Sequence, residues 1–207
     1  MHAYITEALG AFFLVLFFGF TGEPLAIGLS LMALVYIGFP VSGAHYNPAV
    51  SFAFFLKRKL SFSEFLGYVA FQLIGAFAAA YILYFLSGSV FYVEPPTDTN
   101  LYQQAFAEFF FVAIFVLVML MLSLSKIHRG NQLVGLVIGL TFGAMLMVST
   151  QISGGVLNPA TAIGTALFDL LNGNDSYVHL LLYVIAPLSG GALAAFTFNY
   201  FNPKWEA

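Results

Sequence analysis

The sequence predicts an all-α membrane protein with six transmembrane helices plus two re-entrant half-helices, arranged as an inverted repeat. Of its 207 residues, 61% are hydrophobic and only 7% are charged, and the motifs of the first half recur in the second. A soluble domain of this size could not cover so much apolar surface with so few polar residues. Intrinsic disorder is excluded because it requires low hydrophobicity and high charge.

Each predicted span satisfies the length that a bilayer requires, which is about 20 mostly apolar residues for a hydrocarbon core about 30 Å thick. The spans are Ala3–Phe20, Leu25–Val41, Phe65–Leu86, Ala105–Leu124, Leu133–Thr150 and Tyr177–Tyr200. Membrane barrels instead use strands of about 10 residues with alternating polarity. The first span is not expected to be a cleaved signal peptide, because no basic segment precedes it.

The basic residues predict the orientation. With six spans, the connections after the second and fourth spans share one side of the membrane with the C-terminal tail. These segments hold all of the Lys and Arg residues: Lys57, Arg58, Lys59, Lys126, Arg129 and Lys204. The positive-inside rule makes that side, with both termini, cytoplasmic, and the plasma (inner) membrane is the expected location. The opposite loops are acidic (Glu23, Glu94, Asp98, Asp169 and Asp175), and Ser87–Gln104 is expected to form an extracellular cover.

A single domain, residues 1–207, is predicted to consist of two repeated halves, about 1–86 and 104–207, with a linker at 87–103. The matched segments are Ile27–Ser30 with Ile138–Thr141, Ser42–Ala49 with Ser153–Ala160, Tyr68-Val69 and Gly75 with Tyr183-Val184 and Gly190, and Glu7 with Glu108. Three spans per half is an odd number, so the second half must enter the membrane inverted. Such repeats place their site near the bilayer midplane.

Each half also contains a shorter apolar segment after its second span, Asn47–Leu56 and Asn158–Phe168. Ten helical residues reach about 15 Å, half of the hydrocarbon core, so these segments are predicted to be half-helices. Asn is a favoured N-cap and Pro a favoured first helical residue. Asn47-Pro48-Ala49 and Asn158-Pro159-Ala160 are therefore expected to begin two helices whose N-termini meet at the midplane.

This arrangement indicates a pore for small neutral molecules. Each helix N-terminus contributes about half a positive charge, which opposes cations and proton-carrying water chains. The two Asn amides can donate hydrogen bonds to a passing oxygen, and the carbonyls before them can accept. A single Asn-Pro-Ala tripeptide is more often only a helix cap, but two copies at matched places in an inverted repeat favour the pore.

With these motifs the sequence resembles the aquaporin and glycerol-facilitator family, also called the major intrinsic proteins. The resemblance covers the whole chain and rests on both Asn-Pro-Ala boxes, the run Gly43–Val50, Glu7, Glu108, Gln72 and Pro187. It implies a right-handed aquaporin-like bundle in the lipid bilayer and a homotetramer with one pore per subunit. It also implies passive passage of water and small neutral solutes, with no cofactor.

The resemblance further implies that Glu7 and Glu108 accept hydrogen bonds from the re-entrant loops, and that His45 supports the first loop. An intramembrane carboxylate can also serve as a proton relay. Because imidazole titrates near neutrality, a pH gate at His45 or His128 is a second alternative.

The family's extracellular constriction maps onto Ile27, Leu146, Gly155 and Thr161. The family usually has Arg where this chain has Thr161, and strict water channels usually have His at the position of Leu146. Gly155 is expected to leave room, so an apolar ring would admit glycerol, urea, ammonia or metalloid hydroxides. Ile27 and Leu146 are bulky, however, and could instead narrow the ring. Glycerol-carrying members usually have Asp where this chain has Ala162.

Two other classes of function stay open at this point. An ion-coupled secondary transporter also uses inverted repeats and broken helices, and a non-conducting structural membrane protein could retain the fold. An enzyme is not expected, because the sequence contains no nucleophile–base pair, metal cluster or phosphate loop. A net charge of −3 and no cysteine argue against nucleic-acid binding and thiolate metal sites.

Overall fold

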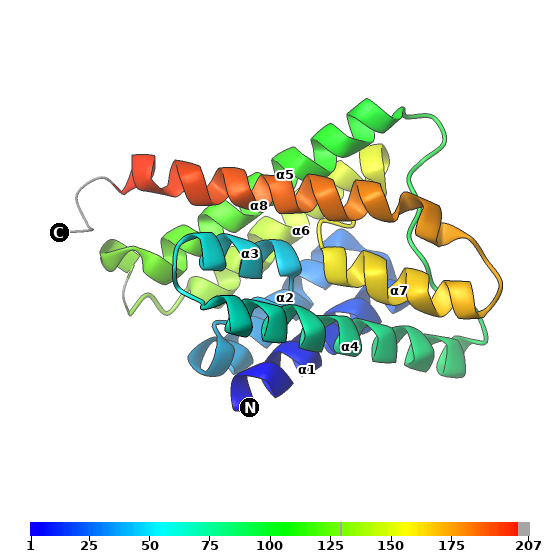
Figure 1. Cartoon of the computed structure of the whole chain (residues 1–207), viewed down its shortest axis with the longest axis horizontal. Coiled ribbons are helices and arrows are strands. Elements are labelled where there is room, and N and C mark those ends of the chain that lie inside the picture. The colour runs from blue at the N-terminus through cyan, green and yellow to red at the C-terminus, as the bar shows by residue number, and fades with distance from the viewer. Residues whose placement is uncertain (129, 203–207) are drawn as a thin grey trace.

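The structure is a computed structural model that describes residues 1–128 and 130–202. Six long helices in this part of the chain are apolar enough to cross a membrane, which confirms the predicted fold class. The α-helices are α1 (His2–Thr21), α2 (Pro24–Ser42), α3 (Pro48–Leu56), α4 (Phe62–Ser87), α5 (Leu101–Leu124), α6 (Val134–Ser153), α7 (Pro159–Leu171) and α8 (Leu180–Phe201) (Figure 1). Short 3₁₀ helices precede α6 and α8, at Lys126–His128 and Ser176–His179.

Polar caps explain where α4 and α5 begin, each before its predicted first residue. Ser61 and Glu64 form a capping box at the start of α4, and Asn100 and Gln103 form another at the start of α5. Each box satisfies backbone N–H groups that the first helical turn leaves unpaired. Hydropathy alone does not detect these turns, because their capping residues are polar.

The two short helices begin as predicted, directly after their asparagines. The side chain of Asn47 accepts a hydrogen bond from Ala49 N at 2.8 Å, and that of Asn158 from Ala160 N at 3.0 Å. The expectation that Asp169 lies in a loop was wrong, since α7 continues to Leu171.

Asp169 is fully buried in the last turns of α7. Its carboxylate accepts hydrogen bonds from the Asn174 side chain at 2.8 Å and from Ser176 N at 3.1 Å. The acidic side chain therefore ties the following connection to the end of α7, which is why a residue that looks like loop in the sequence belongs to a helix.

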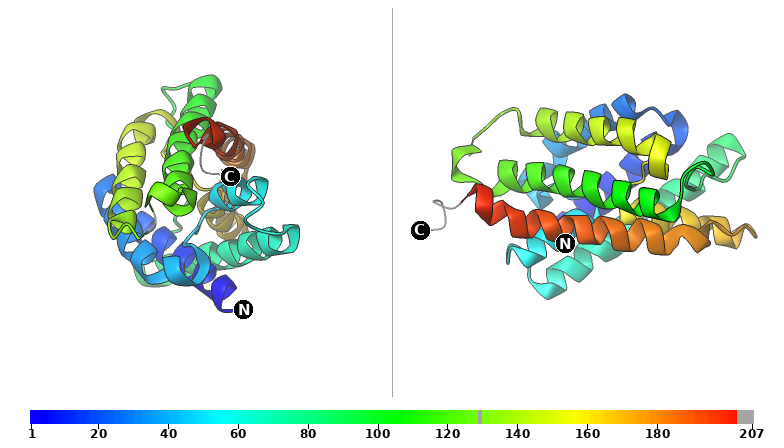
Figure 2. Two further views of the ribbon diagram at one scale, coloured as in Figure 1. Left: turned by 90° about the vertical axis from the view of Figure 1, so that its left-hand side faces the viewer. Right: turned by 90° about the horizontal axis from the view of Figure 1, so that it is seen from above.

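The helices pack in matched pairs. In the first half, α1 contacts α2 and α4. In the second half, α5 contacts α6 and α8 in the matching way. Each short helix packs against the last long helix of the other half, α3 against α8 and α7 against α4. Figure 1 shows α3 and α7 end to end between α4 and α8, and the end-on view in Figure 2 shows α3 on one side of the bundle, beside α4 and α8. This pattern brings the starts of the two short helices to the middle of the bundle.

Glycines allow the long helices to cross in direct backbone contact. Where α2 meets α6, a Cβ atom on Gly28 would lie 2.6 Å from Gly139 O, and one on Gly139 would lie 2.5 Å from Gly28 O. Gly75 approaches α1, and Gly190 approaches α5, with equally little space. Small residues at such crossings are what membrane helices use to pack closely.

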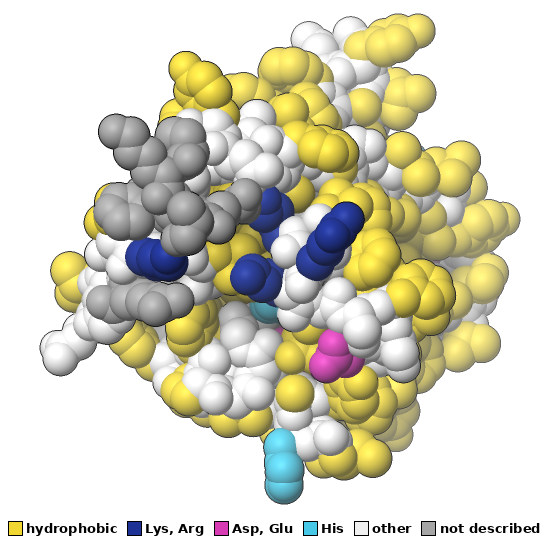
Figure 3. Space-filling model, turned by 60° about the vertical axis from the view of Figure 1, so that its left-hand side comes forward, with side chains coloured by type: hydrophobic (Ala, Val, Ile, Leu, Met, Phe, Trp, Pro, Cys, Tyr) yellow, Lys and Arg dark blue, Asp and Glu magenta, His cyan; other side chains and the backbone are white. Residues whose placement is uncertain are grey.

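The basic connections lie at one end of the bundle. The turn after α3, which holds Lys57–Lys59, lies at the same end as the α5–α6 connection (Figure 1). Figure 3 shows Lys and Arg side chains gathered on this face. Of the six basic residues, Arg129 and Lys204 lie outside the described residues.

The connection from α4 to α5 lies at the opposite end and folds over the second half. Val93 is buried, and the hydroxyl of Thr99 donates a hydrogen bond to Ile152 O at the end of α6, at 2.8 Å. Because α5 begins at Leu101, this cover is shorter than the predicted Ser87–Gln104 segment.

Candidate functional site: the junction of the two short helices

The two predicted asparagines meet in the middle of the bundle. Asn47 Nδ2 donates a hydrogen bond to Leu157 O at 2.9 Å, and Asn158 Nδ2 donates one to Tyr46 O at 3.0 Å. The residue before each asparagine thus accepts from the other half's asparagine. Both side chains are at most 2% exposed, so the N-termini of α3 and α7 face each other in the protein interior.

Each of these amides retains one donor. A side-chain amide has two N–H groups and one oxygen. One N–H of each asparagine binds the opposite carbonyl, and the oxygen caps its own helix. Within residues 1–128 and 130–202, the second N–H of Asn47 and of Asn158 has no acceptor, so each can donate to a molecule that reaches the junction.

Glu7 holds the first loop from α1. Its carboxylate accepts hydrogen bonds from Ser42 Oγ at 2.6 Å, His45 N at 3.0 Å and Tyr46 N at 2.6 Å. The loop needs such support because Ala44 and Tyr46 have positive φ angles of 54° and 51°, which cost energy for residues other than glycine.

Glu108 holds the second loop in the matched way from α5. It accepts hydrogen bonds from Ser153 Oγ at 2.8 Å, Val156 N at 3.0 Å and Leu157 N at 2.8 Å. These donors satisfy irregular backbone that the membrane interior would otherwise leave unpaired. The placement of both carboxylates agrees with the role that the family resemblance implied.

Two tyrosines repeat this support. The hydroxyl of Tyr68 donates to Ser42 O at 2.8 Å, and that of Tyr183 donates to Ser153 O at 2.6 Å. Each bond fixes the last turn of the helix that precedes a loop. The sequence repeat of these tyrosines was visible, but their role depends on contacts between helices.

Among the described residues, a polar network around Glu7 has no counterpart in the second half. Gln72 Nε2 donates to Glu7 Oε2 at 2.7 Å and to Ser51 Oγ at 2.9 Å, and Ser51 Oγ lies 3.1 Å from His45 Nδ1. Ser51 Oγ thus connects the Gln72 amide to the His45 ring. The network orients the imidazole of His45, which packs on Phe54 with ring centroids 4.2 Å apart.

The second half has apolar residues at the positions that match His45, Ser51 and Gln72. His45 and Ser51 correspond to Val156 and Ala162, 111 residues later. Gln72 corresponds to Pro187, 115 residues later. Aligning the two halves by sequence already shows that these positions differ. Only the side-chain contacts show that the polar residues of the first half form a network.

The four residues mapped to the extracellular constriction are all buried. Ile27 on α2 and Leu146 on α6 are each 1% exposed and belong to one buried apolar cluster, which also includes residues of α1, α3, α5 and α8. Thr161 lies in the first turn of α7, and its hydroxyl makes no hydrogen bond to the described part of the chain. It is therefore a neutral donor and acceptor where the family usually has a cation.

Gly155 does not leave open space, contrary to the expectation from its missing side chain. A Cβ atom on Gly155 would lie 2.5 Å from Thr150 Oγ1 and 2.9 Å from Thr150 N. Its φ angle of 64° also favours glycine. Gly155 is thus required by the loop conformation and by its packing on α6.

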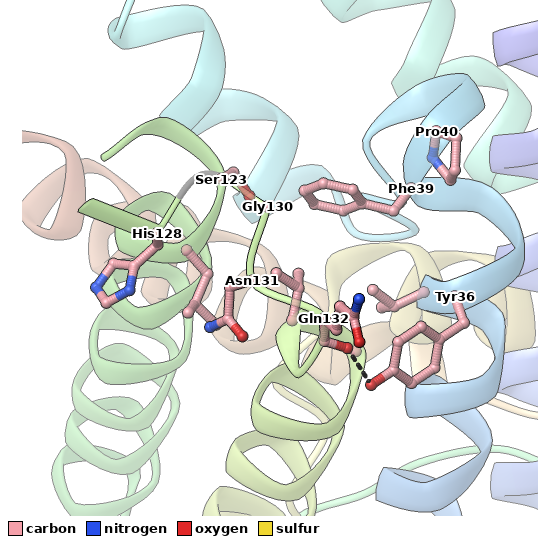
Figure 4. Close-up of a pocket in the computed structure, with 12 residues that line it drawn as sticks. Tyr36, Phe39, Pro40, Ser123, His128, Gly130, Asn131 and Gln132 are labelled. Carbon is pink, nitrogen blue, oxygen red and sulfur yellow. Dashed lines mark hydrogen bonds between the residues drawn. The ribbon is translucent and has the colours of Figure 1, made fainter. Parts of the chain in front are cut away.

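A cavity of about 510 Å³ opens at the basic end of the bundle, between α2, α5 and α6 (Figure 4). Val35 and Phe39 contribute apolar surface, and His128, Asn131 and Gln132 contribute polar groups from the α5–α6 connection. The Tyr36 hydroxyl donates to Gln132 O at 2.9 Å, which holds this connection against α2.

Comparisons with known proteins agree with this geometry. The family model described as Major intrinsic protein matches residues 1–198. Glycerol uptake facilitator protein-like 6 of Lactiplantibacillus plantarum is 34% identical over 95% of this chain and 96% of its own length. Aquaporin NIP3-1 of Arabidopsis thaliana is 32% identical over 86% of this chain, which matches 56% of the plant protein.

A solved structure shows the same fold. The X-ray structure of the aquaglyceroporin from Plasmodium falciparum has a TM-score of 0.81 and 24% identity, covering 98% of this chain and 95% of that one. The chain is therefore a multi-pass membrane protein that belongs to the major intrinsic proteins, a family of passive channels for water and small solutes and not of enzymes.

Proposed function

We propose that this chain conducts water and small neutral solutes past the Asn47 and Asn158 amides, within one domain of two inverted halves, residues 1–86 and 104–207, joined by 87–103. The observation that carries this proposal is the reciprocal bonding of each asparagine to the opposite loop, which leaves one N–H per amide to donate. A passing oxygen can accept from both amides in turn. Neither amide carries a net charge that would retain it.

The same junction opposes ions. Each of α3 and α7 contributes about half a positive charge at its N-terminus, and the two ends face one another. Glu7 and Glu108 are not free to relay protons along the route, because both are buried and their oxygens already accept several hydrogen bonds. We propose that both carboxylates have a structural role and that the junction excludes cations and protons.

The basic end of the bundle supports an orientation. Lys57, Arg58 and Lys59 lie in the turn after α3, at the end that holds the α5–α6 connection (Figure 1), and the positive-inside rule assigns such residues to the cytoplasm. We therefore place both termini inside and the α4–α5 cover outside, in the plasma (inner) membrane. A homotetramer would cover part of the large apolar surface of the six spans.

The solute range is set, in this proposal, by Ile27, Leu146, Gly155 and Thr161. A hydroxyl at Thr161 can hydrogen-bond a polyol or an amide, whereas an arginine would add bulk and charge. The similarity to a glycerol uptake facilitator supports glycerol beside water, and urea, ammonia and metalloid hydroxides are the other neutral solutes to test.

Thr161→Arg is expected to reduce glycerol and urea flux several-fold while reducing water flux less, because it restores a bulky cation to the constriction. The measurement is stopped-flow light scattering on proteoliposomes, with sucrose, glycerol and urea gradients in turn. Thr161→Ser, which keeps the hydroxyl, serves as the control. Equal reduction of all three fluxes would contradict the assignment of Thr161 to a selective ring.

The unmodified protein tests the function itself in the same assay. A channel gives water permeability above that of empty liposomes and solute flux that does not saturate. Saturable uptake that depends on an ion gradient would instead identify a secondary transporter. Permeability equal to that of empty liposomes would identify a structural protein.

A further inference from the structure

Two phenylalanine rings meet inside the bundle, between α5 and α6. The ring centroids of Phe115 and Phe142 are 4.9 Å apart, and the side chains are only 2% and 1% exposed. Another aromatic pair on α5, Phe106 with Phe110, has a similar centroid distance of 5.5 Å but is 62% and 41% exposed. The Phe115–Phe142 pair therefore faces the interior, while the second pair lies on the outer surface.

The position of the pair along each helix places it on the cytoplasmic side of the asparagine junction. Phe115 follows Glu108 by seven residues, two helical turns or about 10 Å along the same face of α5. Glu108 binds the loop beside Asn158. Phe142 precedes Leu146 by one turn on α6, again toward the basic end of the bundle.

The cavity at the basic end lies further along the same two helices, α5 and α6. Leu122 follows Phe115 by seven residues and Gly135 precedes Phe142 by seven, and both line the cavity of Figure 4. Along the axes of α5 and α6, the rings thus lie at a level between the junction and the cavity. On the facing helices, Leu14 and Leu31 are buried in the same apolar cluster.

We propose that Phe115 and Phe142 form a second, apolar constriction that limits water flux and determines which solutes pass on the cytoplasmic side of the junction. This inference rests on the route proposed above. The two rings touch each other, so water would pass beside the pair. Phenyl rings offer water no conventional hydrogen-bond acceptor or donor, and water passing beside them must give up hydrogen bonds. Hydrophobic constrictions of this kind control permeation by dewetting.

Replacing either ring with a smaller side chain tests the proposal. Phe142→Ala and Phe115→Ala are expected to raise water permeability of proteoliposomes several-fold and to raise glycerol flux by a larger factor. Phe106→Ala and Phe110→Ala are matched controls on the outer face of α5, for which no change in flux is expected. Because loss of a buried ring can prevent folding, Phe142→Leu provides a milder variant with the same expected direction.

A labelling experiment adds a measurement that a packing role would not affect. The chain has no cysteine, so Phe142→Cys introduces a single thiol. A small, charged, water-soluble methanethiosulfonate reagent is expected to modify this variant and to lower its water flux. Phe110→Cys, on the outer face of α5, is expected to keep its flux after the same treatment.

The outcomes separate this inference from the proposed function. If the unmodified protein conducts but the folded Phe115 and Phe142 variants have unchanged flux, and Phe142→Cys does not respond to the reagent, the pair is packing only and the inference is wrong. If the unmodified protein is no more permeable than empty liposomes, the proposed function fails first, and the inference with it.

Discussion

Glu108→Ala is expected to abolish the folded channel. The change removes the acceptor for Ser153 Oγ, Val156 N and Leu157 N, all of which are buried. A buried donor left without a partner costs about 1–3 kcal/mol. Ser153 Oγ can still donate to Ser149 O at 3.2 Å, so the two backbone donors imply a loss of about 2–6 kcal/mol. The loop that carries Asn158 would lose its position as well. Thermal unfolding in detergent measures the first effect, and water flux in proteoliposomes measures the second.

Two further variants test whether the loss of stability and flux is specific to the Glu108 carboxylate. Glu108→Gln keeps one acceptor oxygen and should give an intermediate loss of stability. Glu94→Ala removes a carboxylate from an exposed position in the α4–α5 cover and should leave both measurements unchanged. A Glu108→Ala protein with the melting temperature and water flux of the unmodified chain would rule out the loop-holding role.

Gly139→Val is the second change with a large expected effect. Its Cβ atom would lie 2.5 Å from Gly28 O and 2.7 Å from Met32 N. These are backbone atoms of α2, which cannot turn aside as a side chain can. The two helices would have to separate, at a cost of about 3 kcal/mol, the upper part of the range for overpacked sites.

Leu140→Val is the matched control for that substitution. Leu140 is the next residue of α6, is 43% exposed, and would receive the same side chain without meeting α2. We expect a lower melting temperature and aggregation on size-exclusion chromatography for Gly139→Val alone. Similar behaviour of both variants would show that the α2–α6 crossing tolerates a side chain.

Much of the fold followed from the sequence because bilayer physics restricts the choices. Length and hydropathy locate the six spans, and Asn-Pro pairs mark the starts of α3 and α7. The ends of elements were less predictable. The first turns after Ser61 and Asn100 are polar, and Asp169 is polar but buried by the chain that follows it.

The candidate site was predictable where a motif occurs twice. Asn47, Asn158 and their supporting carboxylates stand at matched positions in the two halves, and the repeat makes them visible. The Gln72–Ser51–His45 network occurs once, so repetition could not reveal its role. Phe115 and Phe142 are two of 25 phenylalanines, and only tertiary packing distinguishes an inward ring from one that faces lipid.

The reciprocal asparagine bonds have a consequence for biosynthesis. Synthesis proceeds from the N-terminus, so the first half emerges from the ribosome before Leu157 and Asn158 exist. Until the second half inserts, Asn47 lacks its carbonyl partner and Tyr46 O lacks its donor. The loop of the first half therefore keeps these two backbone and side-chain groups unpaired until Leu157 and Asn158 pack against it.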